Sequence, residues 1–324
     1  MTRVGITTTI PAEVVYAAGM VPVDLNNVFV NDENPGALVE EAELAGYPRN
    51  ICAWIKGIYS TVLKHQDIKT VIAVTQGDCS NTHALMETLQ LAGIEVIPFA
   101  FPYDKDTDLL RLQIEKLMSV FGVSWVSVNA AKKRLDDVRR QVWELDRLTW
   151  QENKVGGWPN HFYQVSCSDF NGNPEEFGCS VSEFLAKVAT RPDNARLRLG
   201  YTGVPPIMND LYGYLEERGA KVVFNEIQRQ FTMPFNTGDM VEQYLLYTYP
   251  YGIFCRLEDI QREASRRELD GIIHYAQSFC FRQIEDLIIR KKIKLPVLTL
   301  EGDNPGRLDA RTRLRLDVFL EMLR

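Results

Sequence analysis

The sequence lacks several features that would assign it directly to a familiar class of enzyme. None of its six cysteines forms a Cys-x-x-Cys pair, which argues against a zinc ribbon. It contains neither a Walker A lysine motif nor the spaced glycines of a dinucleotide fingerprint. It also has no clear Ser–His–Asp or paired-carboxylate signature. Hydrolysis, hydride transfer and phosphoryl transfer are therefore poor hypotheses for this chain.

Long apolar runs and an excess of positive charge are also missing. No run approaches the roughly 20 residues needed to span a bilayer, and residues 1–6 lack the pattern of a signal peptide. The net charge of −7 makes nucleic acid and anionic membranes poor partners. We expect a cytoplasmic protein, and in that compartment six cysteines are not expected to form a disulfide framework.

The composition is that of an ordinary soluble protein, and strands alternate with helices along the chain. With 324 residues, 45% hydrophobic and 24% charged, the chain is long enough for two globular units. In the first half, helices are predicted at residues 10–19 and 81–92, and strands at 21–25, 70–76 and 95–101. In the second half, strands are predicted at 197–202, 220–224, 271–277 and 296–300. Helices are predicted there at 207–218, 281–292 and from about 307 onward. This alternation predicts parallel sheets with covered faces, whose ligands bind outside the carboxyl ends of the strands.

A segment of different composition separates the two halves. Residues 107–152 carry a helical pattern, and the charges within 131–145, at spacings of three and four, predict a solvated helix face. Residues 153–180 contain clusters of Gly, Pro and Asn that predict loops. The expected division is an N-terminal α/β lobe at 1–125, a helical and loop-rich connecting segment at 126–195, and a C-terminal α/β lobe at 196–324.

Three cysteines lie where a strand or loop leads into a predicted helix. Cys52 follows Asn50, a candidate N-cap, so Cys52 is expected in the first helical turn. Cys79 and Cys280 follow apolar strands and precede helices, which puts both at strand carboxyl ends. A helix N-terminus favours the thiolate, and thiolates bind soft metals and iron–sulfur clusters. For each cysteine taken alone, a small buried structural side chain is the alternative.

Seven segments, in order along the chain, resemble the 2-hydroxyacyl-CoA dehydratase D-component family, which includes subunits of benzoyl-CoA reductases. The segments are Ile10–Val23, Pro48–Lys56, Gly77–Asn81, Thr202–Pro205, Glu217–Val223, Asp270–Cys280 and Leu295–Asp303. Each motif is weak by itself. Their joint order, with cysteines at all three expected places, makes the resemblance specific.

The resemblance implies two flavodoxin-like (Rossmann-like) parallel-sheet lobes with a [4Fe–4S] cluster bound between them. By position the ligands would be Cys52, Cys79 and Cys280, leaving one iron open to another ligand or to substrate. It also implies single-electron chemistry on a CoA thioester. Dehydratase relatives (lyases) form a ketyl radical that loses hydroxide, and reductase relatives (oxidoreductases) act on aromatic thioesters. An ATP-hydrolysing iron–sulfur activator would deliver the electron, and a homologous subunit or a second copy would complete the anaerobic enzyme.

Two alternatives stay open from the sequence. Some relatives carry a larger double-cubane [8Fe–9S] cluster, with which they reduce small molecules, and Cys255 falls where they often have a further ligand. The other alternative is a non-catalytic cluster-bearing partner or electron-transfer subunit. Ser80 and Phe281, which follow the second and third cysteines, differ from the residues common in the family. The acyl group and the choice between dehydration and reduction therefore stay open.

Residues for proton transfer are harder to assign from the sequence. His83 is near Cys79 in the chain, and imidazole titrates near neutrality, but His83 also fits the first turn of a helix. Glu13 is a candidate for reaching a substrate and equally fits helix capping. His274 lies within an apolar strand, where a hydrogen-bonded core histidine is the better interpretation. Cys167 and Cys179 lie in predicted loops and are not expected to bind metal.

Overall fold

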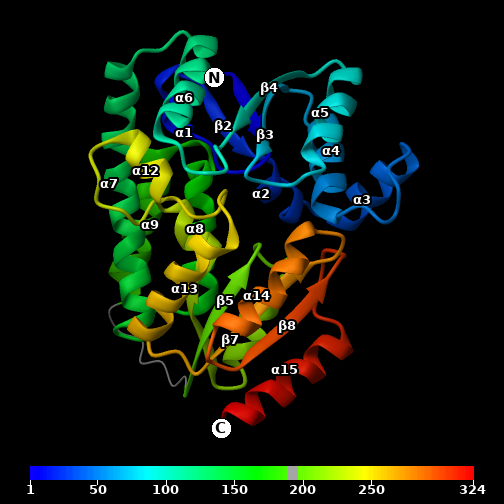
Figure 1. Cartoon of the computed structure of the whole chain (residues 1–324), viewed down its shortest axis with the longest axis vertical. Helices are drawn as coiled ribbons and strands as arrows, with labels where there is room; N and C mark the ends of the chain where they lie inside the picture. The colour runs from blue at the N-terminus through cyan, green and yellow to red at the C-terminus, as the bar shows by residue number, and fades with distance from the viewer. Residues whose placement is uncertain (189–195) are drawn as a thin grey trace. The chain divides into compact units, whose positions relative to one another are not determined.

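The computed structural model of the chain describes residues 1–188 and 196–324. These residues form two compact units (Figure 1). Unit 1 comprises Met1–Arg140, Ser166–Gly178 and Met233–Gly252, and unit 2 comprises Gln141–Val165, Cys179–Thr232 and Ile253–Arg324. The three-part division expected from the composition stays a prediction.

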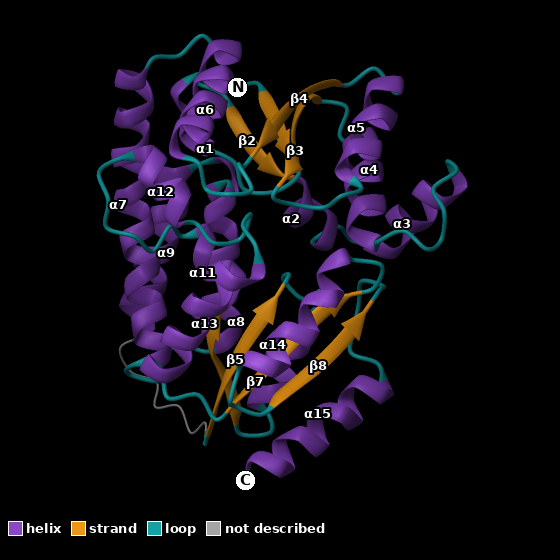
Figure 2. Cartoon of the chain, viewed as in Figure 1, coloured by secondary structure: helices purple, strands orange, loops and turns teal. Residues whose placement is uncertain are grey.

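Unit 1 contains a four-stranded parallel sheet of order β2-β1-β3-β4. Figure 2 labels its strands β2, β3 and β4. Its strands are β1 (Arg3–Ile6), β2 (Val21–Asp24), β3 (Ile68–Gln76) and β4 (Glu95–Ala100). The predicted strands are confirmed to within a residue or two. The sequence pattern did not indicate β1, because four residues are too few for a clear alternation. Residues 71–74 of β3 are completely buried, as expected for a parallel strand covered on both faces.

Helices flank the sheet of unit 1. They are α1 (Ala12–Ala17), α2 (Leu25–Val30), α3 (Pro35–Leu44), α4 (Ala53–Lys64), α5 (Thr82–Leu91), α6 (Thr107–Phe121), the short 3₁₀ turns η1 (Ser166–Ser168) and η2 (Phe170–Gly172), and α12 (Met240–Leu246). Asp106 caps α6 by accepting a hydrogen bond from the Leu109 N–H, and Gly122, with φ 64°, ends the helix. Apolar residues of α4 and α5, including Ile55, Ile58 and Leu85, pack together with Val71 of β3.

Unit 2 contains a second four-stranded parallel sheet, of order β6-β5-β7-β8. Its strands are β5 (Leu197–Gly203), β6 (Ala220–Asn225), β7 (Gly271–Gln277) and β8 (Val297–Gly302). When the strands of each unit are numbered along the chain, both sheets have the order second, first, third, fourth. This is the beginning of a flavodoxin-like order, so the predicted fold class is confirmed.

The helices of unit 2 cover its sheet and extend to the end of the chain. They are α8 (Gly157–Val165), α9 (Pro174–Val188, which begins in unit 1), α10 (Leu211–Glu216), α11 (Glu226–Phe231), α13 (Ile253–Arg266), η3 (Phe281–Glu285), α14 (Asp286–Lys292) and α15 (Ala310–Leu323). The helix predicted at 207–218 is shorter than expected. The helix predicted at 281–292 opens with a 3₁₀ turn. Within α15, Leu316, Phe319 and Leu320 are buried, as the predicted apolar face requires.

Of two expectations about the middle of the chain, one is confirmed in part and the other is wrong. Helix α7 (Trp125–Trp150) has the predicted solvated face, on which Lys133, Arg134, Asp137, Arg140 and Glu144 are exposed. Lys132 and Arg139, however, are only 3% and 1% exposed and form ion pairs. Charge spacing identifies a helix face but not what covers it. The region expected to be loop-rich is instead largely helical, in α8 and α9. There the turn-forming residues start helices, as when Asn173 accepts a hydrogen bond from the Glu176 N–H at the start of α9.

Among the described residues, no helix is both long enough and apolar enough to cross a membrane.

Candidate functional site

In unit 1, Cys52 marks the start of α4. Its backbone is extended (φ −51°, ψ 132°), it is the N-cap of the helix, and it is 5% exposed. The assignment of Asn50 as the N-cap is therefore wrong by two positions, because the chain turns into the helix only after Cys52. The Cys52 carbonyl accepts the first hydrogen bonds of α4, from the N–H groups of Ile55 and Lys56. The thiol thus lies at the electropositive end of a three-turn helix.

Cys79 lies just beyond the carboxyl end of β3, the strand that follows α4 in the chain. It follows the last residue of β3, Gln76, by three positions, and its carbonyl accepts a hydrogen bond from Thr82, the first residue of α5. Its half-buried side chain packs against the same apolar cluster as Ile51 and Ile55. Three residues connect α4 to β3, so the start of α4 returns to the carboxyl end of β3. Cys52 and Cys79 therefore lie at the same edge of this sheet.

In unit 2, Cys280 occupies the position equivalent to Cys79. It follows Gln277, the last residue of β7, by three positions and caps η3 with extended backbone (φ −87°, ψ 133°). Its N–H donates to the Gln277 carbonyl at 3.1 Å. Phe279 immediately before it has φ 63°, an uncommon conformation for an aromatic residue. Both β3 and β7 are the third strand of their sheet, beside the point where the strand order reverses, which is where doubly wound sheets bind ligands.

Cys255 occupies a position similar to that of Cys52. It lies in the first turn of α13, which precedes β7 as α4 precedes β3. The two cysteine-bearing segments of unit 2 are joined by an ion pair between Arg256, the next residue, and Glu285, the last residue of the turn that Cys280 caps. Each unit thus presents a helix-start cysteine and a strand-end cysteine at the carboxyl edge of its sheet.

The remaining two cysteines lie elsewhere. Cys167 is 2% exposed in η1, and burial raises the pKa of its thiol to about 12, so the thiolate is strongly disfavoured. Cys179 is exposed on α9. In residues 1–188 and 196–324, no group of three or more His, Cys, Asp and Glu side chains is arranged to hold a metal ion.

The two weak candidates for proton transfer have different surroundings. His83 is exposed in the first turn of α5. Glu13 is completely buried, and its carboxylate accepts hydrogen bonds from Arg139 (2.8 Å), Gln243 (3.0 Å) and Tyr244 (2.8 Å). Burial raises the pKa of Glu13, but the Arg139 charge and the hydrogen bonds outweigh it and hold the pKa below its usual range. Glu13 is therefore ionised at the centre of a structural ion-pair network.

His274 is a buried, hydrogen-bonded histidine, as expected. It is 2% exposed, and its Nδ1 lies 2.8 Å from Asp286 Oδ1, which also accepts a hydrogen bond from Thr299 at 2.6 Å. Burial lowers the pKa of His274 despite the neighbouring Asp286. The ring is therefore neutral at pH 7 and fixes α14 against β7 and β8.

An ion pair at the carboxyl edge of the second sheet was not evident from the sequence. Glu226 follows the last residue of β6, is 0% exposed, and accepts a hydrogen bond from the Gly203 N–H at 3.0 Å. Its carboxylate is held by Arg256, with Nε to Oε1 at 2.6 Å. Burial raises the pKa of Glu226, but the Arg256 charge and the hydrogen bonds outweigh this effect and hold the pKa below its usual range. Two features of the sequence could have indicated this ion pair: Glu226 directly follows a strand, and Arg256 directly follows Cys255.

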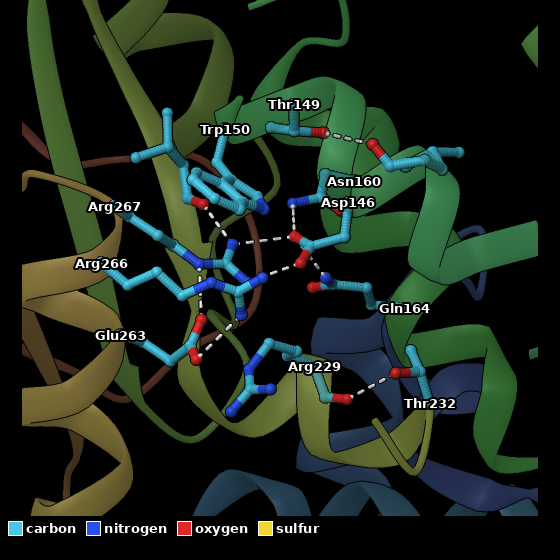
Figure 3. A network of polar contacts seen from close by, with 12 residues as sticks. Asp146, Thr149, Trp150, Asn160, Gln164, Arg229, Thr232, Glu263, Arg266 and Arg267 are labelled. Carbon is cyan, nitrogen blue, oxygen red and sulfur yellow. Dashed lines mark hydrogen bonds and ion pairs between the residues drawn. The ribbon is translucent and has the colours of Figure 1, made fainter. Parts of the chain in front are cut away.

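A second polar network stabilises unit 2 away from this edge (Figure 3). Arg267 lies between Asp146, at 2.6 Å, and Glu263, at 2.9 Å, and also donates to the Val223 carbonyl. Asn160 and Gln164 of α8 donate to the same Asp146 carboxylate. These contacts join α7, α8 and α13 to the sheet, and they explain why buried charges occur in the middle of the chain.

The fold and the edge residues define a two-unit, doubly wound α/β protein with cysteines at the strand carboxyl ends. The chain belongs to the 2-hydroxyglutaryl-CoA dehydratase, D-component, family, because the model of that family matches residues 7–323 of its 324 residues. The match confirms the resemblance recognised in the sequence. A search of the curated proteins found no match to the chain.

Proposed function

We propose that this chain is the iron–sulfur subunit of an ATP-activated radical 2-hydroxyacyl-CoA dehydratase. The observation that carries the proposal is the equivalent placement of Cys79 and Cys280, each three residues after the third strand of a doubly wound sheet, in a member of the dehydratase D-component family. Cys52, at the start of α4, is the third ligand. Its partners are an ATP-hydrolysing activator protein and a second subunit, and its substrate is a CoA thioester.

The donor chemistry of these residues suits a [4Fe–4S] cluster. Thiolate sulfur is the usual protein ligand of such clusters, and three thiolates leave one iron with an open position. Cys52 and Cys280 are the N-cap residues of α4 and η3, and the positive end of a helix such as α4 favours the thiolate form. When bound, the cluster would supply single electrons to the thioester. The half-buried environments of Cys79 and Cys280 limit access by water.

The ligand assignment is tested by cysteine substitution with iron and acid-labile sulfide analysis after anaerobic purification. Cys52→Ala, Cys79→Ala and Cys280→Ala are each expected to lose most of the iron, because a site with three protein ligands does not retain a cluster on two. Cys179→Ala is the matched control and is expected to keep the wild-type iron content, since this exposed residue lies on α9. Full iron and sulfide in any of the first three variants would overturn the assignment.

The second candidate is a double-cubane [8Fe–9S] protein that reduces small molecules. It is favoured by Cys255, which lies at the start of α13 as Cys52 lies at the start of α4. Loss of iron from Cys255→Ala, together with more than four irons per wild-type chain, would support this candidate. Full retention of iron by Cys255→Ala supports the single cubane.

The dependence on ATP is tested separately. The protein is mixed anaerobically with a cognate activator, a strong reductant and a 2-hydroxyacyl-CoA, with and without ATP. Electron paramagnetic resonance and product analysis are expected to show reduction and loss of water only when activator and ATP are both present. Equal turnover without them would exclude the proposed mechanism even if the cluster is real.

A further inference from the structure

Residues 233–252, which we call the return segment, belong to unit 1 although both flanking stretches belong to unit 2. The segment contains α12, whose Tyr244 Oη donates to Glu13 Oε2 at 2.8 Å and lies 3.0 Å from the Ile10 carbonyl. Lys132 Nζ donates to the Thr237 carbonyl at 2.8 Å. The first part of the return segment is therefore fixed to α1 and α7 by buried and partly buried polar contacts.

Aromatic rings fix the second part of the return segment. The ring of Phe101, which directly follows β4, lies 6.0–6.4 Å from the rings of Tyr244, Tyr247 and Tyr251. All four side chains are at most 2% exposed, and Tyr251 Oη donates back to the Tyr244 carbonyl at 3.0 Å. Packed aromatic side chains of this kind form a rigid base because they have few rotatable bonds and bury large areas.

From this base the return segment reaches the loop that carries Cys79. Tyr249 Oη donates a hydrogen bond to Asp78 Oδ1 at 2.8 Å, and Asp78 directly precedes Cys79. Gly77 has φ 99°, and a Cβ at this position would lie 2.6 Å from Pro250 Cβ. Two successive residues of the Cys79 loop are thus in contact with two successive residues of the return segment.

We propose that Tyr249 is a positioning residue, which holds the Gly77–Cys79 loop through Asp78 and so fixes the direction of the Cys79 thiol. A loop that leaves a strand has few contacts of its own, whereas a ligand has to be held to within about 0.5 Å of its working position. A hydrogen bond of 2.8 Å from a tyrosine on a rigid aromatic base meets that requirement. That the thiol then binds a cluster rests on the proposed function; the positioning itself does not.

The test compares two substitutions that each remove one phenol hydroxyl and keep the ring. Tyr249→Phe removes the donor to Asp78, and Tyr251→Phe is the matched control, because that hydroxyl donates within the return segment. In metal-free protein, Tyr249→Phe is expected to raise the alkylation rate of Cys79 by iodoacetamide about fivefold, with exposed Cys179 as the internal reference. Amide hydrogen exchange of residues 77–80 is expected to accelerate similarly. Tyr251→Phe is expected to leave both rates unchanged.

Asp78→Ala is the second variant and removes the acceptor from the loop side. It is scored by hydrogen exchange at residues 77–80, because the lost carboxylate also alters the reactivity of the neighbouring thiol. Acceleration like that of Tyr249→Phe supports the proposal. Wild-type exchange and alkylation rates in Tyr249→Phe would overturn it, as would equal acceleration in Tyr251→Phe.

A spectroscopic readout separates positioning from general stability. In iron-loaded protein, Tyr249→Phe is expected to shift or broaden the paramagnetic resonance signal relative to Tyr251→Phe, at an equal thermal midpoint. An unchanged signal would overturn the role of Tyr249 toward the cluster. If the wild type binds no iron while Tyr249→Phe still accelerates alkylation of Cys79, the proposed function fails and the positioning of the thiol stands.

Discussion

At the scale of single residues, two glycines of unit 2 differ in whether the structure has room for a larger side chain. Gly203 ends β5 with φ 94°, and a Cβ there would lie 2.1 Å from the Tyr275 carbonyl oxygen of the neighbouring strand. Gly213 lies in α10, and a Cβ there would meet nothing within 4 Å. The first glycine lets the strand end approach β7 closely, and the second only adds flexibility to a helix.

We therefore expect opposite effects of the same substitution at these two positions. Gly203→Ala is expected to lower the free energy of unfolding by about 3 kcal/mol or more, through backbone strain and the clash. Gly213→Ala is expected to raise it by about 0.5–1 kcal/mol, through the lower entropy of the unfolded chain. Urea unfolding of both variants measures the difference. Similar effects at the two positions would contradict the inference that the end of β5 requires a glycine at position 203.

A pair of buried carboxyl groups in unit 1 makes stability depend on pH. Asp169 accepts hydrogen bonds from the backbone N–H groups of Asp24, at 2.7 Å, and Asn171, at 2.9 Å. Burial, followed by the charge of the neighbouring Asp24, raises the pKa of Asp169 to about 7. The pKa of Asp24 is also raised, chiefly by burial. A carboxyl group with a raised pKa binds its proton more tightly in the folded than in the unfolded chain.

The sign of the pH dependence follows from that difference. The contribution of Asp169 is fully present below its unfolded pKa of about 4 and is lost as pH rises through about 7. Asp169→Asn, which does not titrate, is expected to become more stable relative to wild type between pH 4 and pH 7. Urea unfolding across this range measures it. Parallel stability curves for the two proteins would contradict a raised pKa of Asp169 in the folded chain.

At the scale of elements, the buried carboxylate of Glu13 connects α1 to α7 by an ion pair and to α12 by hydrogen bonds, although the three helices are distant in sequence. Glu13 of α1 and Arg139 of α7 have side chains 0% and 2% exposed, with Arg139 Nη1 and Glu13 Oε1 2.8 Å apart. Gln243 and Tyr244 of α12 bond the same carboxylate. Removing one partner of such a pair leaves the other charge buried without its counter-ion, which costs more than the pair contributes.

Glu13→Gln is accordingly expected to lower the free energy of unfolding by about 3 kcal/mol, while keeping the side-chain size. The matched control is Asp137→Asn, which breaks the exposed pair of Asp137 with Arg140 on the same helix and is expected to cost less than about 0.5 kcal/mol. Chemical denaturation of both variants measures the effects. A loss of enzymatic activity in Glu13→Gln at unchanged stability would instead indicate a direct role in the reaction.

At the scale of the whole molecule, the chain consists of two units with the same strand order and similar cysteine positions. The chain belongs to a family whose members are described as one component, the D-component, of a dehydratase. The proposed chemistry also requires an electron donor that this chain does not itself supply.

We expect the chain to form a two-subunit assembly, with a co-expressed homologous subunit or with a second copy of itself. Native mass spectrometry and small-angle scattering at micromolar concentration measure the mass. The control is each subunit expressed separately, which distinguishes the two kinds of assembly. A monomer under both conditions would contradict the expected assembly.

The sequence by itself determined the alternation of strands and helices and the positions of three cysteines at element ends. Runs such as residues 71–74, and helix starts near Cys52 and Cys79, depend on neighbours close in the chain, so local patterns suffice to predict them. The sequence predicted Asn50 as the N-cap and Cys52 in the first helical turn, whereas Cys52 is itself the N-cap. Neighbouring positions at a helix start differ only in their backbone angles, which a local pattern does not record.

Only the tertiary structure decided what covers these elements. Glu13 bonds Gln243, 230 positions away, and Asp78 bonds Tyr249, 171 positions away, so no local pattern records either contact. The same holds for Arg139, whose charge reads as a solvated helix face until α1 and α12 are in place. The free energy of burying a charge depends on the partners that the fold brings to it, and those partners come from distant parts of the chain.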